Sequence, residues 1–320
     1  MSDKILTKKQ PEKGMQTRKR NKLIFFIAMI AVPLLQFCIF YLYVNFNSIK
    51  MAFEIYRIPE SGQGYDVEFA GIENFKIAWN AIFSTEGWDK IKYSLISYVV
   101  SLCIVTPLAL FFSYYFVKKY LGHGMFRVLL YVPHIVGSVV MAVLYQALLG
   151  DDIYGKLTGN PGLISSNPNQ AAQTFLTILI FNIWIGFGTN VMMYTGTMSS
   201  VDSSLTESAS LEGVNSLQEF WYIYFPMIWP TFVTFIVTGM TGLFTNQMCL
   251  FNFFNDAGGS FETFGYYIFI KSKKARLEVG LTAMASYSEV SALGLLITLF
   301  LVPVILTVRK LMTKYGPRTD

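Results

Sequence analysis

The 320 residues are 53% hydrophobic and 16% aromatic, while only 14% are charged. A soluble domain normally has about 25% charged residues, so this composition excludes an ordinary soluble globular protein and indicates a chain embedded in a membrane. The formal net charge of +5 comes largely from the two ends of the chain, which relates to membrane orientation and argues against nucleic-acid binding.

The chain opens with a basic stretch. Residues 1–22 are rich in lysine and arginine and lack apolar periodicity, which predicts a disordered tail on the cytoplasmic side. The apolar run at 23–44 is too long for the core of a secretory signal peptide, and no small-residue cleavage site follows it. It therefore predicts a first transmembrane helix, in which Pro33 is tolerated. Residues 45–92 are mixed in polarity and are expected outside.

Five further apolar segments are long enough to cross a bilayer. We predict these spans at about residues 93–117, 126–149, 174–198, 227–250 and 288–308. With the first span they form a six-helix transmembrane domain over residues 23–310, followed by a short tail at 311–320. An even number of spans places both termini on the same side of the membrane. The basic ends of the chain and the basic turn after Val117 predict by the positive-inside rule that this side is the cytoplasm. The basic stretch 271–276 then falls in an external loop, against that rule.

A polar and acidic insert at 201–226 separates the fourth span from the fifth. Ser204 with Glu207, and Ser216 with Glu219, have the spacing of capping boxes, which predicts two short helices. Gly213 can supply the left-handed residue that ends the first helix, and Pro226 is expected to end the second.

The sequence contains no pattern for catalysis: it has no phosphate-binding loop, and no pairing of carboxylates or cluster of metal ligands is visible. Polar residues inside the spans are the groups that need explaining. We predict that Asn246, Gln247, Asn252 and Glu289 line a substrate pathway. The alternatives are hydrogen bonds between helices for the amides, and a position at the membrane interface for Glu289.

Several segments carry a family resemblance. The stretch from Glu207 to Gly213, followed by Phe220, Ile223, Pro226 and Pro230, resembles the EAA loop of permeases of ATP-binding-cassette (ABC) importers. It departs from that pattern at Ser208 and Glu212. Other similar segments are FAGIENF at 69–75, FRVLLYVP at 126–133, the glycine pair at 258–259 and GLTAMAS at 280–286. Together they resemble the first permease subunit of a carbohydrate importer.

This resemblance implies an all-α, polytopic membrane protein with the type I ABC importer permease fold. It implies that the loop residues Glu207, Ala209, Glu212, Gly213, Phe220 and Pro226 couple the chain to an ATPase. The implied partners are a second permease subunit, two ATPase subunits that hold ATP and Mg²⁺, an extracellular solute-binding protein and a carbohydrate substrate. No cofactor is expected on this chain.

Two alternatives remain open at this point. The chain can belong to an importer for glycerol phosphate, amino acids or peptides, which shares the loop but carries another substrate. It can also be an ion-coupled secondary transporter, for which Glu289 and His134 form the only candidate relay pair.

Overall fold

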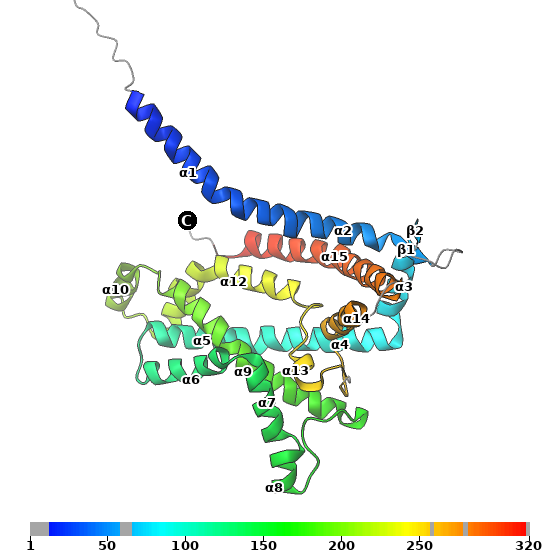
Figure 1. The fold of residues 1–320 in the computed structure, drawn as a ribbon. Coiled ribbons are helices and arrows are strands. Elements are labelled where there is room, and N and C mark those ends of the chain that lie inside the picture. Colours follow the sequence, from blue (N-terminus) through cyan, green and yellow to red (C-terminus); the bar gives the residue numbers. More distant parts are fainter. Residues whose placement is uncertain (1–12, 58–65, 257–258, 278–280, 318–320) are drawn as a thin grey trace, which may run out of the picture.

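The computed structural model describes residues 13–57, 66–256, 259–277 and 281–317, and these residues form a bundle of long helices (Figure 1). Within them, five helical segments are long and apolar enough to cross a bilayer: Arg20–Ala52, Thr85–Val117, Pro168–Met198, Ser216–Thr241 and Met284–Tyr315. A pair of helices at 123–136 and 138–158, bent by 100°, makes a sixth if it counts as one span.

The first span consists of α1 (Lys13–Phe37), a π turn (Cys38–Tyr43) and α2 (Val44–Ala52). The prediction of a disordered tail up to residue 22 is wrong from Lys13 onward, because lysine and arginine are good helix formers and extend the helix beyond its apolar part. The large side chains from Leu23 to Val44 are exposed, as suits a segment surrounded by lipid.

A small cap follows α2 and was not foreseen in the all-α prediction. Strands β1 (Glu54–Arg57) and β2 (Asp66–Phe69) form an antiparallel pair, and α3 (Glu73–Phe83) follows. Asn74 holds the cap to the first span, since its buried amide donates to the carbonyls of Ala52 and Glu54 at 3.0 and 2.9 Å.

The second span comprises α4 (Thr85–Val100), a π turn (Ser101–Val105) and α5 (Thr106–Val117). It begins earlier than residue 93 because Ser84 caps it, accepting the N–H of Gly87. The third segment divides into α6 (His123–Val136) and α7 (Ser138–Leu149). The break lies at Gly137, whose φ of +89° favours glycine, while Pro133 lies inside α6. A π turn (Asp151–Gly155) and α8 (Lys156–Thr158) then occupy part of the expected external loop.

The fourth span is α9 (Ala171–Met198), entered through a 3₁₀ turn (Pro168–Gln170). After the polar insert, α11 (Ser216–Glu219), a π turn (Phe220–Tyr224) and α12 (Phe225–Thr241) form one continuous helix. Pro226 therefore does not end a helix, and the fifth span runs from 216 to 241 instead of 227 to 250. The proline is the second residue after the π turn. A π turn is wider than an α-helical turn and is a usual place for a helix to accommodate a residue that cannot make the regular backbone hydrogen bond.

The chain then becomes irregular inside the bundle before α13 (Leu250–Phe254) and α14 (Phe264–Leu277). The stretch 271–276 thus belongs to a helix and not to a loop. The last helix, α15 (Leu281–Tyr315), extends into the predicted C-terminal tail as far as Tyr315 and packs against α2, α3, α12 and α14. Figure 1 shows α2 and α15 side by side, while α10 lies at one end of the bundle and the β1–β2 pair at the other.

Candidate functional site

The insert between the fourth and fifth spans begins with α10 (Ser203–Leu211). Its cap is Asp202, whose carboxylate accepts the N–H of Ser204 at 2.9 Å, so the predicted capping box of Ser204 and Glu207 is wrong. An aspartate at this position satisfies one of the free N–H groups of the first turn. The same backbone hydrogen bond lowers the pKa of the Asp202 carboxyl.

The end of α10 is a Schellman motif. The N–H of Gly213 donates to the carbonyl of Ser210, and the N–H of Val214 donates to the carbonyl of Ala209, both at 3.2 Å. Gly213 has the left-handed φ of +78° that this motif requires. Ala209 is buried, whereas Leu211 is 89% exposed and Glu207 and Glu212 are exposed. The helix and its C-cap thus present the exposed apolar side chains of Leu205 and Leu211 together with the acidic side chains of Glu207 and Glu212.

The second half of the insert is capped by Asn215. Its side chain accepts the N–H of Gln218 at 2.9 Å, and the Gln218 side chain accepts the N–H of Asn215 at 3.1 Å. The capping box is therefore shifted by one residue from the predicted pair of Ser216 and Glu219. This shift leaves the carboxylate of Glu219 free to bind elsewhere.

Glu219 is buried and forms contacts that the sequence analysis missed. Its Oε2 accepts the hydroxyl of Tyr114 at 2.8 Å, and its Oε1 lies 2.7 Å from Nζ of Lys118. The Glu219 side chain is 9% exposed and that of Lys118 is 27% exposed. No local pattern relates these residues, because more than 100 positions separate Glu219 from α5.

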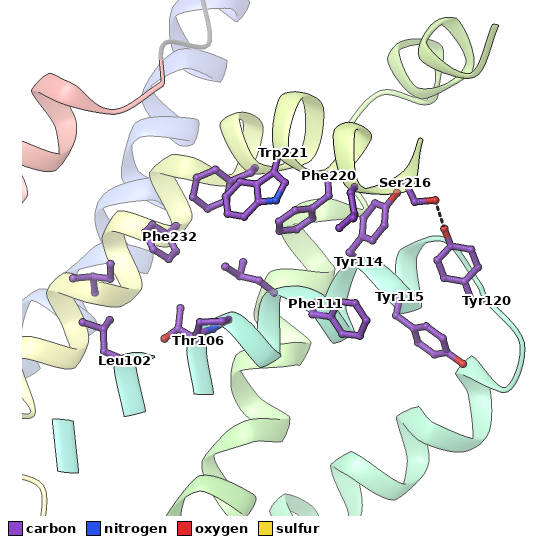
Figure 2. Close-up of a pocket in the computed structure, with 15 residues that line it drawn as sticks. Leu102, Thr106, Phe111, Tyr114, Tyr115, Tyr120, Ser216, Phe220, Trp221 and Phe232 are labelled. Carbon is purple, nitrogen blue, oxygen red and sulfur yellow. Dashed lines mark hydrogen bonds between the residues drawn. The ribbon is translucent and has the colours of Figure 1, made fainter. Parts of the chain in front are cut away.

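An apolar recess of about 660 Å³ lies beside this contact, between α5 and the start of the fifth span (Figure 2). Figure 2 shows Phe220 and Trp221 on one side and Phe111 on the other, while Ser216 and the hydroxyl of Tyr120, 2.9 Å apart, close one end. Phe220, a predicted coupling residue, is half-buried and its ring meets that of Tyr114 edge-on at 5.5 Å.

A second cavity, of about 500 Å³, lies deeper in the bundle between α4, α5, α9 and α12. It is lined by both apolar and polar side chains, including residues of the irregular stretch after α12. The polar lining residues are Ser94, Ser97, Tyr98, Ser101, Thr106, Asn182, Asn190, Tyr194, Thr238 and Asn246. Irregular backbone at this depth requires cover from protein or from a water-filled cavity, and here it borders both packed helices and the cavity.

The wall of this cavity contains a left-handed turn formed by Met248 and Cys249, with φ of +51° and +58°. Asn246 Oδ1 accepts the N–H of Met248 at 2.8 Å. The side-chain amide of Asn182 donates to the backbone carbonyl of Met248, also at 2.8 Å. Two consecutive non-glycine residues in this conformation are strained, and such strain often concentrates at functional sites. Asn182 also lines the cavity, although the sequence analysis did not include it among the predicted pathway residues and preferred hydrogen bonds between helices for the other amides.

The other predicted pathway residues are placed differently. Asn246 lines the cavity, whereas Gln247 and Asn252 are not among its lining residues in the described part of the chain. Glu289 pairs with Lys271 of α14 at 2.6 Å, and His134 lies 3.2 Å from the hydroxyl of Thr189. The two members of the suggested proton relay thus have separate partners. Of the glycine pair, Gly258 lies outside the described residues. Among those residues, no cluster of side chains could hold a metal ion.

Residues 81–320 match the family described as the inner membrane component of binding-protein-dependent transport systems. The chain belongs to this family. It is an integral membrane permease, and the recognition made from the EAA-like loop is confirmed.

Curated relatives of this chain are named as permease proteins of transport systems. The chain is 24% identical to the arabinooligosaccharide permease AraP of Bacillus subtilis, over 66% of each chain. It is 24% identical to the lactose permease LacF of Rhizobium radiobacter, over 65% of this chain and 72% of that one. It is 23% identical to the sn-glycerol-3-phosphate permease UgpA of Salmonella typhi, over 57% of this chain and 61% of that one. The matched segments thus span about two thirds of these relatives.

Solved structures share the fold. A bacterial ABC transporter involved in import of the acidic polysaccharide alginate superposes with a TM-score of 0.67 at 18% identity, covering 95% of this chain and 100% of that one. The bacterial alginate transporter in complex with an alginate pentasaccharide-bound periplasmic protein superposes with a TM-score of 0.66 at 17% identity, covering 91% of this chain and 94% of that one. The type I permease fold predicted from the sequence is confirmed.

Proposed function

We propose that this chain is one permease subunit of an ATP-driven importer and forms half of the pathway for a neutral carbohydrate. The observation that carries the substrate class is the cavity between α4, α5, α9 and α12. Among the described residues that line it there are hydroxyl and amide groups but no Lys, Arg, Asp or Glu. Such a lining suits a solute rich in hydroxyl groups, because each buried polar group needs a hydrogen-bonding partner.

The same lining argues against the alternative substrates. Glycerol phosphate, amino acids and peptides carry formal charges, and a charge moved into a partly dry cavity needs an opposite charge or several strong donors. Tyr98 and Phe235 instead provide aromatic faces beside the polar groups. Asn182, Asn190 and Asn246 are the amides with which we expect a sugar to exchange hydrogen bonds. Gln247 and Asn252 are not among the described residues that line the cavity, so we do not propose this role for them.

The energy for transport comes from partner subunits in this proposal. The exposed residues of α10, with Glu207, Leu211 and Glu212, form the surface that contacts an ATPase, which holds ATP and Mg²⁺. A second permease completes the pathway, a second ATPase completes the nucleotide sites, and an extracellular solute-binding protein delivers the sugar. Basic residues near both ends of the chain support cytoplasmic termini. The chain itself is proposed to bind no cofactor and to catalyse no reaction.

The test is uptake by the complete transporter reconstituted in proteoliposomes. Neutral mono- and oligosaccharides, including lactose and an arabino-oligosaccharide, are compared with sn-glycerol 3-phosphate, amino acids and a peptide, with ATP enclosed. We expect ATP-dependent uptake of a neutral sugar that a protonophore does not reduce. Uptake of a charged solute in its place would overturn the substrate class. Uptake that collapses with the protonophore at constant ATP would overturn the ABC mechanism in favour of ion coupling.

A further inference from the structure

The contact between Glu219, Lys118 and Tyr114, here called the Glu219 clamp, joins two spans at the end of the bundle that carries α10. Lys118 and Tyr114 stand at the end of the second span, and Glu219 stands in the first turn of the fifth. The clamp therefore connects helices that lie side by side but are far apart in the sequence.

The charges of the clamp match the helices that carry them. Lys118 lies at the carboxyl end of α5, where helix carbonyls produce a partial negative charge, and Glu219 lies near the amino end of the fifth span, where the partial charge is positive. The ion pair thus agrees with both helix dipoles. A reversed pair would oppose both.

Two polar contacts join the start of the fifth span to the end of the second. The Ser216 hydroxyl lies 2.9 Å from that of Tyr120, just beyond α5, and the clamp reaches Tyr114 within α5 and Lys118 at its end. The hydrogen bonds that the side chains of residues 202–213 make in the structure all stay within that segment, for example from Ser208 to Ser204 and from Ser210 to Glu207. The capping box of Asn215 and Gln218 then fixes the short connection that leads to Glu219. Of these two contacts, the clamp is the one through which a displacement of α10 can reach α5 itself.

Both clamped helices continue to the polar cavity. Thr106 of α5, and Phe235 and Thr238 of α12, line its wall on the same helices that carry Tyr114 and Glu219. If α5 and α12 moved independently, a shift of α10 would move one wall of the cavity past the other. If they move together, the cavity is displaced or opened as a unit.

We propose that the Glu219 clamp holds the second and fifth spans in one register, so that movement of α10 shifts both walls of the cavity together. This inference rests on the proposed coupling of α10 to an ATPase. Glu219 and Lys118 act as positioning residues. Buried ion pairs are weak evidence for stability, but they are satisfied in a single register, whereas apolar surfaces such as the adjoining recess tolerate sliding. The clamp supplies that register.

The test uses the complete transporter with Glu219→Leu/Lys118→Met as a double variant, Glu219→Gln, and Lys119→Met as a matched control. Lys119 is exposed in the same turn and forms no ion pair in the described structure. Thermal unfolding, ATP hydrolysis stimulated by the binding protein, and sugar uptake are measured together. The decisive quantity is sugar transported per ATP hydrolysed.

We expect the double variant to fold and to hydrolyse ATP, while the sugar transported per ATP falls at least tenfold. The same ratio should fall less in Glu219→Gln, which keeps the hydrogen bond to Tyr114. It should be unchanged in the Lys119→Met control. A ratio within twofold of wild type in the folded double variant would overturn the proposal. Parallel loss of stability, hydrolysis and uptake at a constant ratio would also overturn it, because that is the result of a purely structural contact. Failure of the proposed function is distinct, since the wild-type transporter itself would then show no ATP-dependent uptake.

Discussion

The end of α10 provides the sharpest test of the coupling loop, through substitution of Gly213. Its φ of +78° belongs to the left-handed region, and a Cβ added there would meet no atom within 4 Å. A side chain is therefore opposed by backbone conformation alone and not by crowding. For this reason a graded series of substitutions isolates the helix end from the packing around it.

The magnitudes follow from the backbone. Alanine in the left-handed region costs about 1–2 kcal/mol, which lowers the ratio of native to frayed helix ends by about 5- to 30-fold. Asparagine tolerates this conformation better, so Gly213→Asn should have a smaller effect. Gly213→Pro is the most severe, because proline requires φ near about −65° and lacks the N–H that donates to Ser210. Uptake is expected to decrease in the order wild type, Gly213→Asn, Gly213→Ala, Gly213→Pro.

Uptake by proteoliposomes measures the effect, with thermal unfolding in detergent and affinity for the binding protein as controls. We expect Gly213→Pro to abolish transport while folding and binding-protein affinity stay intact, since α10 lies at the end of the bundle. Full uptake by the proline variant, or an asparagine variant weaker than the alanine one, would refute the reasoning that the left-handed helix end positions the coupling surface.

Three further outcomes are expected. Glu207→Lys reverses an exposed charge on α10, so uptake should fall at least tenfold with no change in the unfolding temperature; normal uptake would exclude this carboxylate from the partner contact. Asn182→Leu leaves the carbonyl of the left-handed turn without its amide donor and should lower the free energy of unfolding by about 1–3 kcal/mol, as read from denaturation in detergent. Gly265→Ala would place a Cβ 2.5 Å from the Asn246 carbonyl oxygen and should cost about 1–3 kcal/mol, whereas Gly196→Ala, with open surroundings, should be tolerated; equal stability of the two variants would contradict the close approach.

Local rules allowed much of this protein to be predicted. The membrane class follows from composition, and the spans follow from apolar length, because a bilayer requires about 20 apolar residues per helix. Gly213 was identified as a helix end because a left-handed residue there suits glycine. The family was recognised from the order of residues around Glu207, and the matching residues 81–320 confirm it.

Other features depended on the tertiary structure. The fifth span begins before Pro226, because a π turn precedes the proline in a continuous helix, and the third segment divides at Gly137, whose φ is positive. Neither feature is visible in hydropathy. The caps shifted to Asp202 and Asn215, since several nearby residues have capping side chains and only the backbone geometry selects among them.

The sequence by itself thus determined the class of molecule, its family and the position of the polar insert between two spans, because each depends on neighbouring residues. Only the tertiary structure decided that Glu219 binds Lys118 and that Asn182 joins Asn246 at the left-handed turn. These contacts join separate helices, and their partners are selected by how the helices pack. No spacing along the chain contains that information.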